Sequence, residues 1–586
     1  MNTFFKSFFA SLLAILVFCI LLFLIFGGIV ASVSKSLEKE AVKTEPNSVL
    51  VLDLNYDIPE QSYRNITFPN PLSRELMPST GLNDILRAIK AAETDKNIKG
   101  IAIQMGVNTN GYATLQEVRD ALFQFRKNSD KFIVSYGEMV NQSSYYLGSV
   151  ADEVYVHPSG YFEFKGLAAQ LSFIKGTLDK LGIRTQVFWA GEFKSATEPL
   201  RLDQMSEQNR EQLRSYVGGL YQLVLEDISQ SRKLSTDSLG NIAANLRAWS
   251  LKDAVAVGML DGLLYEDEWQ EVLDKKTGAD ETPTIGLADY TRGLAKETGN
   301  WDSQVAVIYA EGNIVDGSGE FGSIGSTSFR KLLKEVREDD EIKAVVIRIN
   351  SGGGSALASD VIWREIGLLK AEKPVVVSMG DYAASGGYMM ACNATKVLAR
   401  PTTLTGSIGV FFILPEISGF MEDKLGITSD TVLTETHADF PSLVRATTEA
   451  ETVQLQRMVD DTYMAFKQQV ADGRSMDMEQ VEALAKGRIW LGTTALDLGL
   501  VDALGGLQDA IEAAAELAGL ESYRTTDLPK QELEFWEELM LDLSEETTTP
   551  PALETLGALM APYNTVKSYI EHPVVRAELP YILEWK

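Results

Sequence analysis

The chain has 586 residues, of which 45% are hydrophobic, and its 53 Lys and Arg against 82 Asp and Glu give a net charge of −29. A chain this acidic is not expected to bind nucleic acid, because phosphate backbones select basic surfaces. Its two cysteines and three histidines exclude a disulfide framework and a thiolate zinc site, and leave little histidine for catalysis. The length predicts three or four domain-sized units.

The first predicted element is a membrane anchor near the N-terminus. No charged residue occurs from Ser7 to Ser34, and this length exceeds the roughly 20 residues with which an α-helix crosses a bilayer. A cleavable signal peptide is the alternative, since small residues surround Ala31, but signal-peptide cores run only about 7–15 residues. The sequence therefore predicts one transmembrane helix within residues 1–40. Lysines flank it on both sides, so charge does not fix its orientation.

Downstream of the anchor the chain repeats itself. The run from Ile98 to Ile103 recurs from Ile342 to Ile347, an offset of 244 residues. Further pairs follow at offsets that fall only from 243 to 241: Ser135/Ser378, Tyr145/Tyr388, Tyr221/Tyr463, Arg232/Arg474, Trp249/Trp490, Gly258/Gly499 and Asp261/Asp502. The sequence therefore predicts one unit written twice, over 48–265 and 303–520, with a linker over 266–302 and an acidic extension over 521–586.

Each copy shows the same order of predicted elements. A strand (49–54; 305–309) precedes an amphipathic helix (82–92; 329–337), a buried strand (98–105; 344–349), another helix and a further strand (131–135; 374–378). Short β-branched runs that alternate with helical periodicity are typical of βαβ units in a mainly parallel sheet. The predicted fold class is α/β, with two tandem units after the transmembrane helix.

The copies differ in a glycine-rich loop. In the second copy NSGGGS (350–355) follows a buried strand and opens a helix, whereas the first copy has GVNTNG (106–111) without the triple glycine. Glycines in such a loop expose backbone N–H groups at a helix start. The loop has no phosphate-binding pattern, which argues against a nucleotide site. Gly353 and Gly354 are therefore candidate oxyanion donors, and a tight turn without chemistry is the alternative.

Two serines of the second copy compete for the role of nucleophile. Ser385 lies in AASGGY and Ser407 in TGSIGV, and neither is in a GxSxG elbow. The first copy has Phe164 opposite Ser407, but Ser143 and Ser144 near the counterpart of Ser385. A polar residue kept in both copies indicates packing at a helix start, whereas one present in a single copy indicates a site. The pattern favours Ser407.

A serine nucleophile needs a base to take its proton. His437 lies beside Ala438 and Asp439 in a loop, where a histidine is usually solvated. Its counterpart at the 243 offset is Lys194, which lies among apolar residues that include Trp189 and Phe193. An apolar setting can lower the pKa of a lysine toward neutrality. Lys194 is the candidate general base, and an exposed lysine at a helix start is the alternative.

Four motifs together resemble the signal peptide peptidase A family, also called protease IV: TGSIGV (405–410), ASGGY (384–388), NSGGGS (350–355) and FKSATEP (193–199). The resemblance covers nearly the whole chain, including the anchor and the duplication. It implies two tandem domains of the Clp/crotonase fold, with Ser407 as nucleophile and Lys194 as general base, contributed by different copies. Gly353 and Gly354 match the family's oxyanion loop, although Gly352 stands where that loop usually has proline.

The resemblance also implies the function and its setting. It implies a serine endopeptidase with a Ser–Lys dyad that hydrolyses apolar peptides, chiefly cleaved signal peptides, and needs no metal or cofactor. Members of the family form homotetramers anchored by a single span in the bacterial inner membrane, with the catalytic part in the periplasm. Two alternatives stay open: a crotonase-fold enzyme acting on acyl thioesters, which predicts a soluble chain, and a catalytically silent membrane scaffold, which predicts loss of Ser407 or Lys194.

Overall fold

The computed structural model describes residues 43–62, 79–294, 303–320, 322–530 and 575–578 of the chain. The anchor predicted over residues 7–34 lies outside these ranges. Within them, no helix combines the length and apolar character that a bilayer crossing requires.

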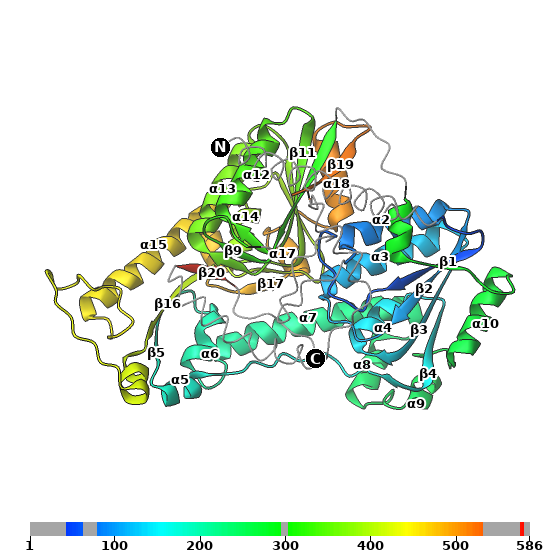
Figure 1. Ribbon diagram of the computed structural model, residues 1–586, viewed down its shortest axis with the longest axis horizontal. Helices are drawn as coiled ribbons and strands as arrows, with labels where there is room; N and C mark the ends of the chain where they lie inside the picture. Colours follow the sequence, from blue (N-terminus) through cyan, green and yellow to red (C-terminus); the bar gives the residue numbers. More distant parts are fainter. Residues whose placement is uncertain (1–42, 63–78, 295–302, 321, 531–574, 579–586) are drawn as a thin grey trace, which may run out of the picture.

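The first repeat is a parallel α/β unit. Its main elements are β1 (Ser48–Asp53), α2 (Leu82–Thr94), β2 (Ile98–Met105), α3 (Tyr112–Asn128), β3 (Phe132–Val140), α4 (Gln142–Gly148), β4 (Glu153–Phe162), α7 (Glu207–Arg232), α8 (Thr236–Ala244), α9 (Leu251–Ala256), β6 (Gly262–Leu263), α10 (Glu266–Thr277), β7 (Thr284–Gly286) and α11 (Leu287–Gly293). The strands form a sheet in the order β6-β4-β3-β2-β1-β7, in which all neighbours run parallel. This sheet lies at the right of Figure 1.

Helices cover both faces of this sheet. One face packs against α2, α3 and α4 in the large core, while Val134 and Tyr136 on the other face pack against Trp269 and Leu273 of α10. Strands buried on both faces read as continuous apolar runs, as they do here. Because α10 covers the sheet and β7 pairs with β1, residues 266–286 belong to the first repeat. The segment predicted as a linker, 266–302, therefore contains a helix and a strand of the first repeat.

The second repeat has the same plan. Its elements are β8 (Gln304–Glu311), β9 (Asn313–Val315), β10 (Ser323–Gly325), α12 (Ser326–Glu338), β11 (Ile342–Ser351), β12 (Gly353–Ser355), α13 (Ala356–Lys370), β13 (Val375–Ala384), α14 (Gly386–Ala391), β14 (Lys396–Ala399), β15 (Leu404–Gly406), β16 (Val410–Glu416), η2 (Phe420–Lys424), α15 (Glu449–Arg474), α16 (Met478–Leu484), β17 (Ile489–Leu491), α17 (Gly492–Asp497), β18 (Ala503–Leu504), α18 (Leu507–Leu517) and β19 (Arg524–Leu528). The sheet order is β17-β15-β13-β11-β8-β19, with β14 also paired to β13 and β18 paired to β14. Only β15 and β17 pair antiparallel among its described strands. The mainly parallel α/β architecture predicted from the sequence is confirmed.

The residue pairs that match in sequence occupy equivalent places in the two repeats. Arg232 lies 2.8 Å from Asp261 in the first repeat, and Arg474 lies 2.6 Å from Asp502 in the second. Each aspartate also accepts the backbone N–H of the adjacent strand, at 2.7 Å in both cases. The helix α18 covers its sheet as α10 does, and β19 pairs with β8 as β7 pairs with β1. The extension predicted over 521–586 therefore starts with a strand of the second repeat.

A third sheet joins the two repeats. Its order is β10-β9-β12-β20-β16-β5, where β20 is Arg576–Glu578 and β5 is Arg184–Ala190. The first repeat contributes β5, which is flanked by α5 (Lys175–Leu181), η1 (Ser195–Thr197) and α6 (Glu198–Arg201). Strand β5 pairs antiparallel with β16 over seven residue pairs, and Figure 1 shows the two strands side by side. This pairing carries first-repeat residues into the second repeat.

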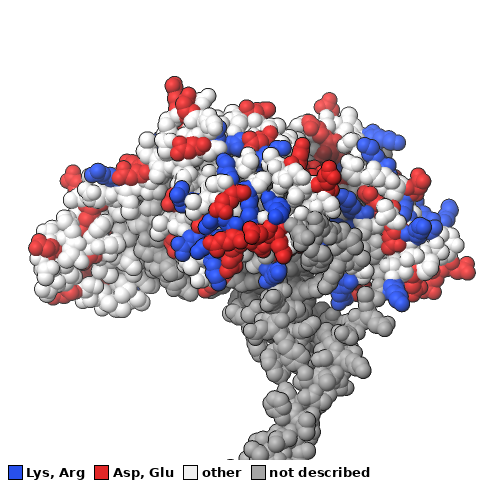
Figure 2. Space-filling model, turned by 90° about the horizontal axis from the view of Figure 1, so that it is seen from above, with Lys and Arg blue, Asp and Glu red and all other residues white. Residues whose placement is uncertain are grey.

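An arm projects from the body beyond this sheet, at the left of Figure 1. We define the arm as α5, β5, β16 and residues 417–448. Its large exposed apolar side chains are Leu181, Trp189, Leu425, Ile427, Val432, Leu433 and Val444. Figure 2 shows acidic and basic residues interspersed over the body, with much of the left end uncharged. The arm therefore exposes several large apolar side chains.

A buried charge cluster connects the repeats. Arg348 of β11 is fully buried, with Nε 2.8 Å from Glu60 and Nη1 2.7 Å from Glu117. Burial raises the pKa of Glu60 to about 7, and the opposing effect of the Arg348 charge is smaller. Removing one member of such a cluster leaves an uncompensated buried charge. The cluster therefore fixes how the first repeat docks on the second.

Candidate active site

Lys194 lies in the turn that follows β5. Its N–H donates to Gly191 O at 3.1 Å, and the N–H of Phe193 donates to Lys486 O of the second repeat at 2.8 Å. Gly487, with φ of +77°, presses against the Lys194 backbone so closely that a Cβ at Gly487 would overlap it. A glycine is required there both for its conformation and for the close approach. These contacts bury the Lys194 side chain, which is 1% exposed.

The Lys194 amine contacts both serines that compete in the sequence. Its Nζ lies 2.7 Å from Ser385 Oγ, 3.0 Å from Ser407 Oγ and 3.2 Å from Ser407 O. Burial lowers the pKa of Lys194 from 10.5 to about 7, although the nearby Glu578 charge opposes the shift. At neutral pH a substantial fraction of the amine is therefore uncharged and able to accept a proton.

Ser385 lies at the sharp turn between β13 and α14. Its backbone has φ of +55° and ψ of −114°, a conformation that non-glycine residues rarely adopt. Its N–H donates to Gly406 O at 2.8 Å, which ties the turn to β15. Strained turns of this kind cluster at functional sites, where the surrounding structure holds them. The Ser385 turn therefore presents its hydroxyl to Lys194 and starts α14 with Gly386.

The glycine loop lies beside this turn. A Cβ built on Gly353 would lie 2.8 Å from Gly386 N and would overlap the carbonyl oxygen of Ala577, and a Cβ on Gly386 would lie 3.0 Å from the same oxygen. The N–H of Gly353 donates to Ser351 Oγ at 3.1 Å, so it is already engaged. Gly354 is the register partner of Ala577. Of the two predicted donors, Gly354 thus faces Ala577 across the strand pair. Gly353 has no side chain, which leaves room for the Ala577 carbonyl oxygen.

The structure also aligns the two repeats at the serine position. The hydroxyls of Tyr145 and Tyr388 each donate to a backbone oxygen at 2.9 Å, in equivalent places. Gln142 lies three residues before Tyr145, and Ser385 lies three residues before Tyr388. Gln142 Oε1 accepts two backbone N–H groups, at 3.0 and 2.9 Å. The counterpart of Ser385 is therefore a glutamine, and Ser143 lies one residue further along, so Ser385 also occurs in only one repeat.

His437 does not reach the site. It lies on the arm with its side chain 48% exposed, and its Nδ1 is 2.9 Å from Glu451 Oε1. Arg445 binds the same carboxylate and also Asp439. The second-repeat counterpart of Lys194 is therefore a surface residue, as the sequence indicated for a loop histidine.

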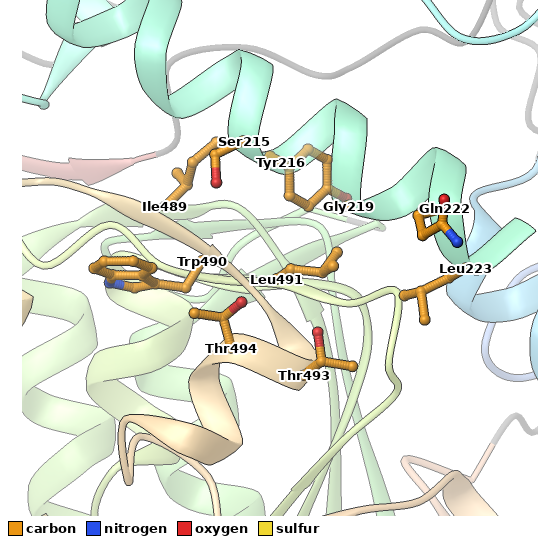
Figure 3. Close-up of a pocket in the computed structure, with 10 residues that line it drawn as sticks. All are labelled: Ser215, Tyr216, Gly219, Gln222, Leu223, Ile489, Trp490, Leu491, Thr493 and Thr494. Atoms are coloured by element: carbon orange, nitrogen blue, oxygen red, sulfur yellow. The ribbon is translucent and has the colours of Figure 1, made fainter.

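A separate pocket of about 290 Å³ lies between the repeats. Figure 3 shows Tyr216 and Gln222 of α7 on one side and Trp490 and Thr494 on the other. None of its lining residues is charged, so it contains no group that could act as a general base. Within the described ranges, no cluster of three or more His, Cys, Asp or Glu side chains is arranged to hold a metal ion. The Lys194 site is therefore the candidate active site.

Known proteins match this chain across both repeats. The model of Peptidase family S49 matches residues 124–280 and 367–521, once in each repeat. The chain is 33% identical over 524 residues to Protease 4 of Salmonella typhi, covering 85% of this chain and 82% of the relative. It is 34% identical over 443 residues to the chloroplastic serine protease SPPA of Arabidopsis thaliana, covering 74% and 65%. It is 32% identical over 450 residues to Protease 4 of Haemophilus influenzae, covering 74% and 72%.

Proposed function

Because this chain belongs to peptidase family S49 and is a serine protease of the protease 4 and SPPA type, we propose that it cleaves peptides with a dyad of Ser385 and Lys194. The observation that carries the proposal is the 2.7 Å contact between Ser385 Oγ and a buried lysine whose pKa is lowered to about 7. A neutral amine at this distance can take the proton of the hydroxyl.

The proposed reaction is acyl transfer. Neutral Lys194 accepts the Ser385 proton while Ser385 Oγ attacks the peptide carbonyl carbon, and the tetrahedral oxyanion is stabilised by the N–H groups of Gly354 and Gly386. Lys194 then gives the proton to the leaving amine, which leaves an ester on Ser385. A water molecule, deprotonated by Lys194, hydrolyses that ester and restores the dyad. The reaction needs no group beyond those of this chain.

Ser407, which the sequence favours as the nucleophile, has a different role in this proposal. Two of its oxygens accept from Lys194, the hydroxyl at 3.0 Å and the carbonyl at 3.2 Å. It therefore holds the lysine from one side while Ser385 lies on the other. Two observations favour Ser385 as the nucleophile: its contact with Nζ is the shortest, and Gly386 and the glycine loop adjoin it.

Covalent labelling separates the two serines. A peptide that carries an electrophilic phosphonate forms a stable adduct with the serine nucleophile, and mass spectrometry of the digested protein identifies the modified residue. We expect the adduct on Ser385, and we expect Ser385→Ala but not Ser407→Ala to abolish it. An adduct on Ser407 would contradict the assignment, and no peptidase activity in the unmodified protein would favour the scaffold alternative.

We further propose the setting that the resemblance implies. The exposed apolar side chains of the arm suit both association with a second copy and proximity to a membrane. The proposal is therefore a homotetramer, held by one span at the bacterial inner membrane with its catalytic part in the periplasm. The proposed substrates are cleaved signal peptides. Release of fragments from a synthetic signal peptide, with a hydrophilic peptide of equal length as control, tests the substrate class.

A further inference from the structure

Gln212 of α7 is a buried amide that no step of the proposed reaction uses. Its side chain is 1% exposed. Nε2 donates to Phe193 O and to Ser195 Oγ at 3.0 Å each, and lies 3.2 Å from Asn209 Oδ1. Oε1 accepts the N–H of Ile489 at 3.2 Å. Since a carbonyl oxygen can only accept and a backbone N–H can only donate, these partners fix which way the amide points.

The nitrogen of this amide holds the turn over residues 191–197, which we call the Lys194 turn. Phe193 and Ser195 are the neighbours of Lys194 on its two sides. The hydroxyl of Ser195 also donates to Phe193 O at 2.9 Å, which closes the turn. A lysine amine sits at the end of a flexible four-carbon stem. The place of Nζ therefore depends first on how firmly the backbone beneath that stem is held, and Gln212 holds it on both sides.

The same helix holds the far end of this segment. Glu198, the first residue of α6, is 2% exposed. Its Oε2 accepts from Asn209 Nδ2 at 2.8 Å and from the N–H of Ser206, the N-cap of α7, at 3.2 Å. The segment that begins at Phe193 and ends at Glu198 is therefore attached at both ends to the first turns of α7.

The oxygen of the Gln212 amide reaches the strand pair beside the serines. Ile489, which lies under α7 in Figure 3, is the register partner of Gly406 in the pair of β15 and β17. Gly406 O accepts the N–H of Ser385 at 2.8 Å, and the carbonyl of the residue before Ile489 accepts the N–H of Ser407 at 2.7 Å. One side chain therefore links the turn that carries the base to the strands that hold the backbone of both serines.

The second repeat has a glutamine at the equivalent position in different surroundings. Helices α7 and α15 have 26 residues each. Gln454 follows Gln212 by 242 residues, the offset that also relates Tyr221 to Tyr463. Gln454 is exposed. The same residue type on the same helix is therefore buried against the site only in the repeat that supplies the base.

We propose that Gln212 is a positioning residue, which sets the place of Lys194 Nζ relative to Ser385 Oγ. The inference rests on the proposed function, because it gives Gln212 a role toward that dyad. Its partners belong to the Lys194 turn, α7 and β17, so it acts on the dyad through these elements. A misplacement of about 1 Å in a catalytic group can lower a rate by about 100-fold, so the effect of such a residue is measurable.

The variant Gln212→Met removes the amide and keeps the length of the side chain. We expect kcat for a short apolar chromogenic peptide to fall by about 10–100-fold with KM within about twofold, because every donor and acceptor of the amide is engaged within the protein. The midpoint of kcat/KM against pH should move to higher pH. A loosened turn admits water to Lys194 and relieves the burial that lowers its pKa. A variant that merely unfolds more easily would not move this midpoint.

The second repeat supplies the matched control. Gln454→Met makes the same substitution on the exposed counterpart, and its kcat, KM and pH midpoint should equal those of the parent. Gln212→Glu is a second test, because it keeps an oxygen for the N–H of Ile489 and loses the donor toward Phe193 O. We expect its kcat to fall as well. A kcat for Gln212→Met or Gln212→Glu equal to that of Gln454→Met would overturn the proposal.

Hydrogen exchange followed by mass spectrometry separates this inference from the proposed function, since it needs no turnover. In residues 191–197 and 487–491 we expect Gln212→Met to exchange faster than the parent by about tenfold or more, and Gln454→Met to match the parent. Unchanged exchange in both segments would contradict the role of Gln212. If exchange changes as expected but no chain, the parent included, cleaves any peptide, the proposed function fails and the attachment of the Lys194 turn stands. If the parent cleaves peptides and Gln212→Met has the same kcat, the proposed function stands and this inference fails.

Discussion

The two repeats have the same framework but keep different parts of one site. In the first repeat, the position of Ser385 is Gln142, which binds loop backbone, and the position of Ser407 is Phe164, which packs against Tyr145 with ring centroids 6.0 Å apart. The first repeat supplies the lysine, and the second has a surface histidine at that position. The two repeats therefore contribute different side chains to the cluster around Lys194.

This difference shows how two copies of one unit can contribute different side chains to one cluster. Strand β5 places Lys194 beside the two serines of the second repeat. The proposed site therefore needs no serine from the first repeat and no base from the second. The shared sheet and the Arg348 cluster, which join the repeats, include residues of both.

The largest expected effect comes from Lys194, the residue that the first repeat contributes to the proposed dyad. Lys194→Ala removes the proposed base and should lower kcat/KM by about 10⁴-fold, with little change in the melting temperature. Its second-repeat counterpart provides the control, and His437→Ala should keep kcat/KM within about twofold. Steady-state hydrolysis of an apolar peptide measures both. Comparable losses in the two variants would mean that the repeats do not divide the site as described.

The docking cluster should give the next largest effect, on stability. Arg348→Met leaves Glu60 and Glu117 buried without their cation, and it should lower the free energy of unfolding by about 3–5 kcal/mol. Gln104 is the counterpart of Arg348 at the 244 offset, and Gln104→Met should cost less than about 1 kcal/mol. Urea denaturation followed by circular dichroism compares the two. A cost for Arg348→Met as small as that of its control would contradict a role in docking.

Ser407→Ala should have an intermediate effect on catalysis. The variant loses one contact to Lys194 and keeps the backbone carbonyl, so we expect kcat to fall by about 10–100-fold. Thr405→Val is the matched control, because it removes a nearby buried hydroxyl that donates to Ala383 O at 2.6 Å and does not contact the lysine. It should cost about 1 kcal/mol of stability with kcat near that of the parent. If Ser407→Ala were as inactive as Ser385→Ala, Ser407 would be more than a positioning residue.

The smallest expected effect is a shift in pH dependence. The proposed base works when neutral, so kcat/KM should rise with pH with a midpoint near the Lys194 pKa of about 7. The Glu578 charge raises that pKa, so Glu578→Gln should move the midpoint to lower pH, whereas Glu578→Asp, which keeps the charge, should not. A shift of the midpoint to higher pH in Glu578→Gln would contradict the effect of the Glu578 charge on the pKa of Lys194.

The duplication and the correspondence of Lys194 with His437 could be read from the sequence because both depend on spacing. An offset that drifts by only three residues identifies equivalent positions, and it brought His437 and Lys194 into correspondence. The sequence preference for Ser407 depended on taking Ser143 and Ser144 as near-counterparts of Ser385. Ser143 and Ser144 lie close to the counterpart of Ser385 in sequence, but the tyrosine hydroxyls align Gln142 with it.

Two further features had no local signal in the sequence. Strand β20 has three residues, too few for a periodic pattern, and its partners β12 and β16 lie more than 150 residues earlier. Helix α10 has a narrow apolar face, with Trp269 and Leu273 as its buried residues. Because so few apolar positions repeat, the sequence of this segment was interpreted as a linker. Both were set by tertiary pairing, which spacing alone does not reveal.

The antiparallel pairing of β5 with β16 has a genetic consequence. Since a chain supplies both Lys194 and Ser385 to its own site, a mixture of Lys194→Ala chains and Ser385→Ala chains contains no complete dyad within any chain. Activity returns in such a mixture only if β5 of one chain pairs with β16 of another, in a strand exchange between subunits. Activity of the mixed Lys194→Ala and Ser385→Ala chains therefore shows whether Lys194 and Ser385 can come from two different chains or must come from the same one.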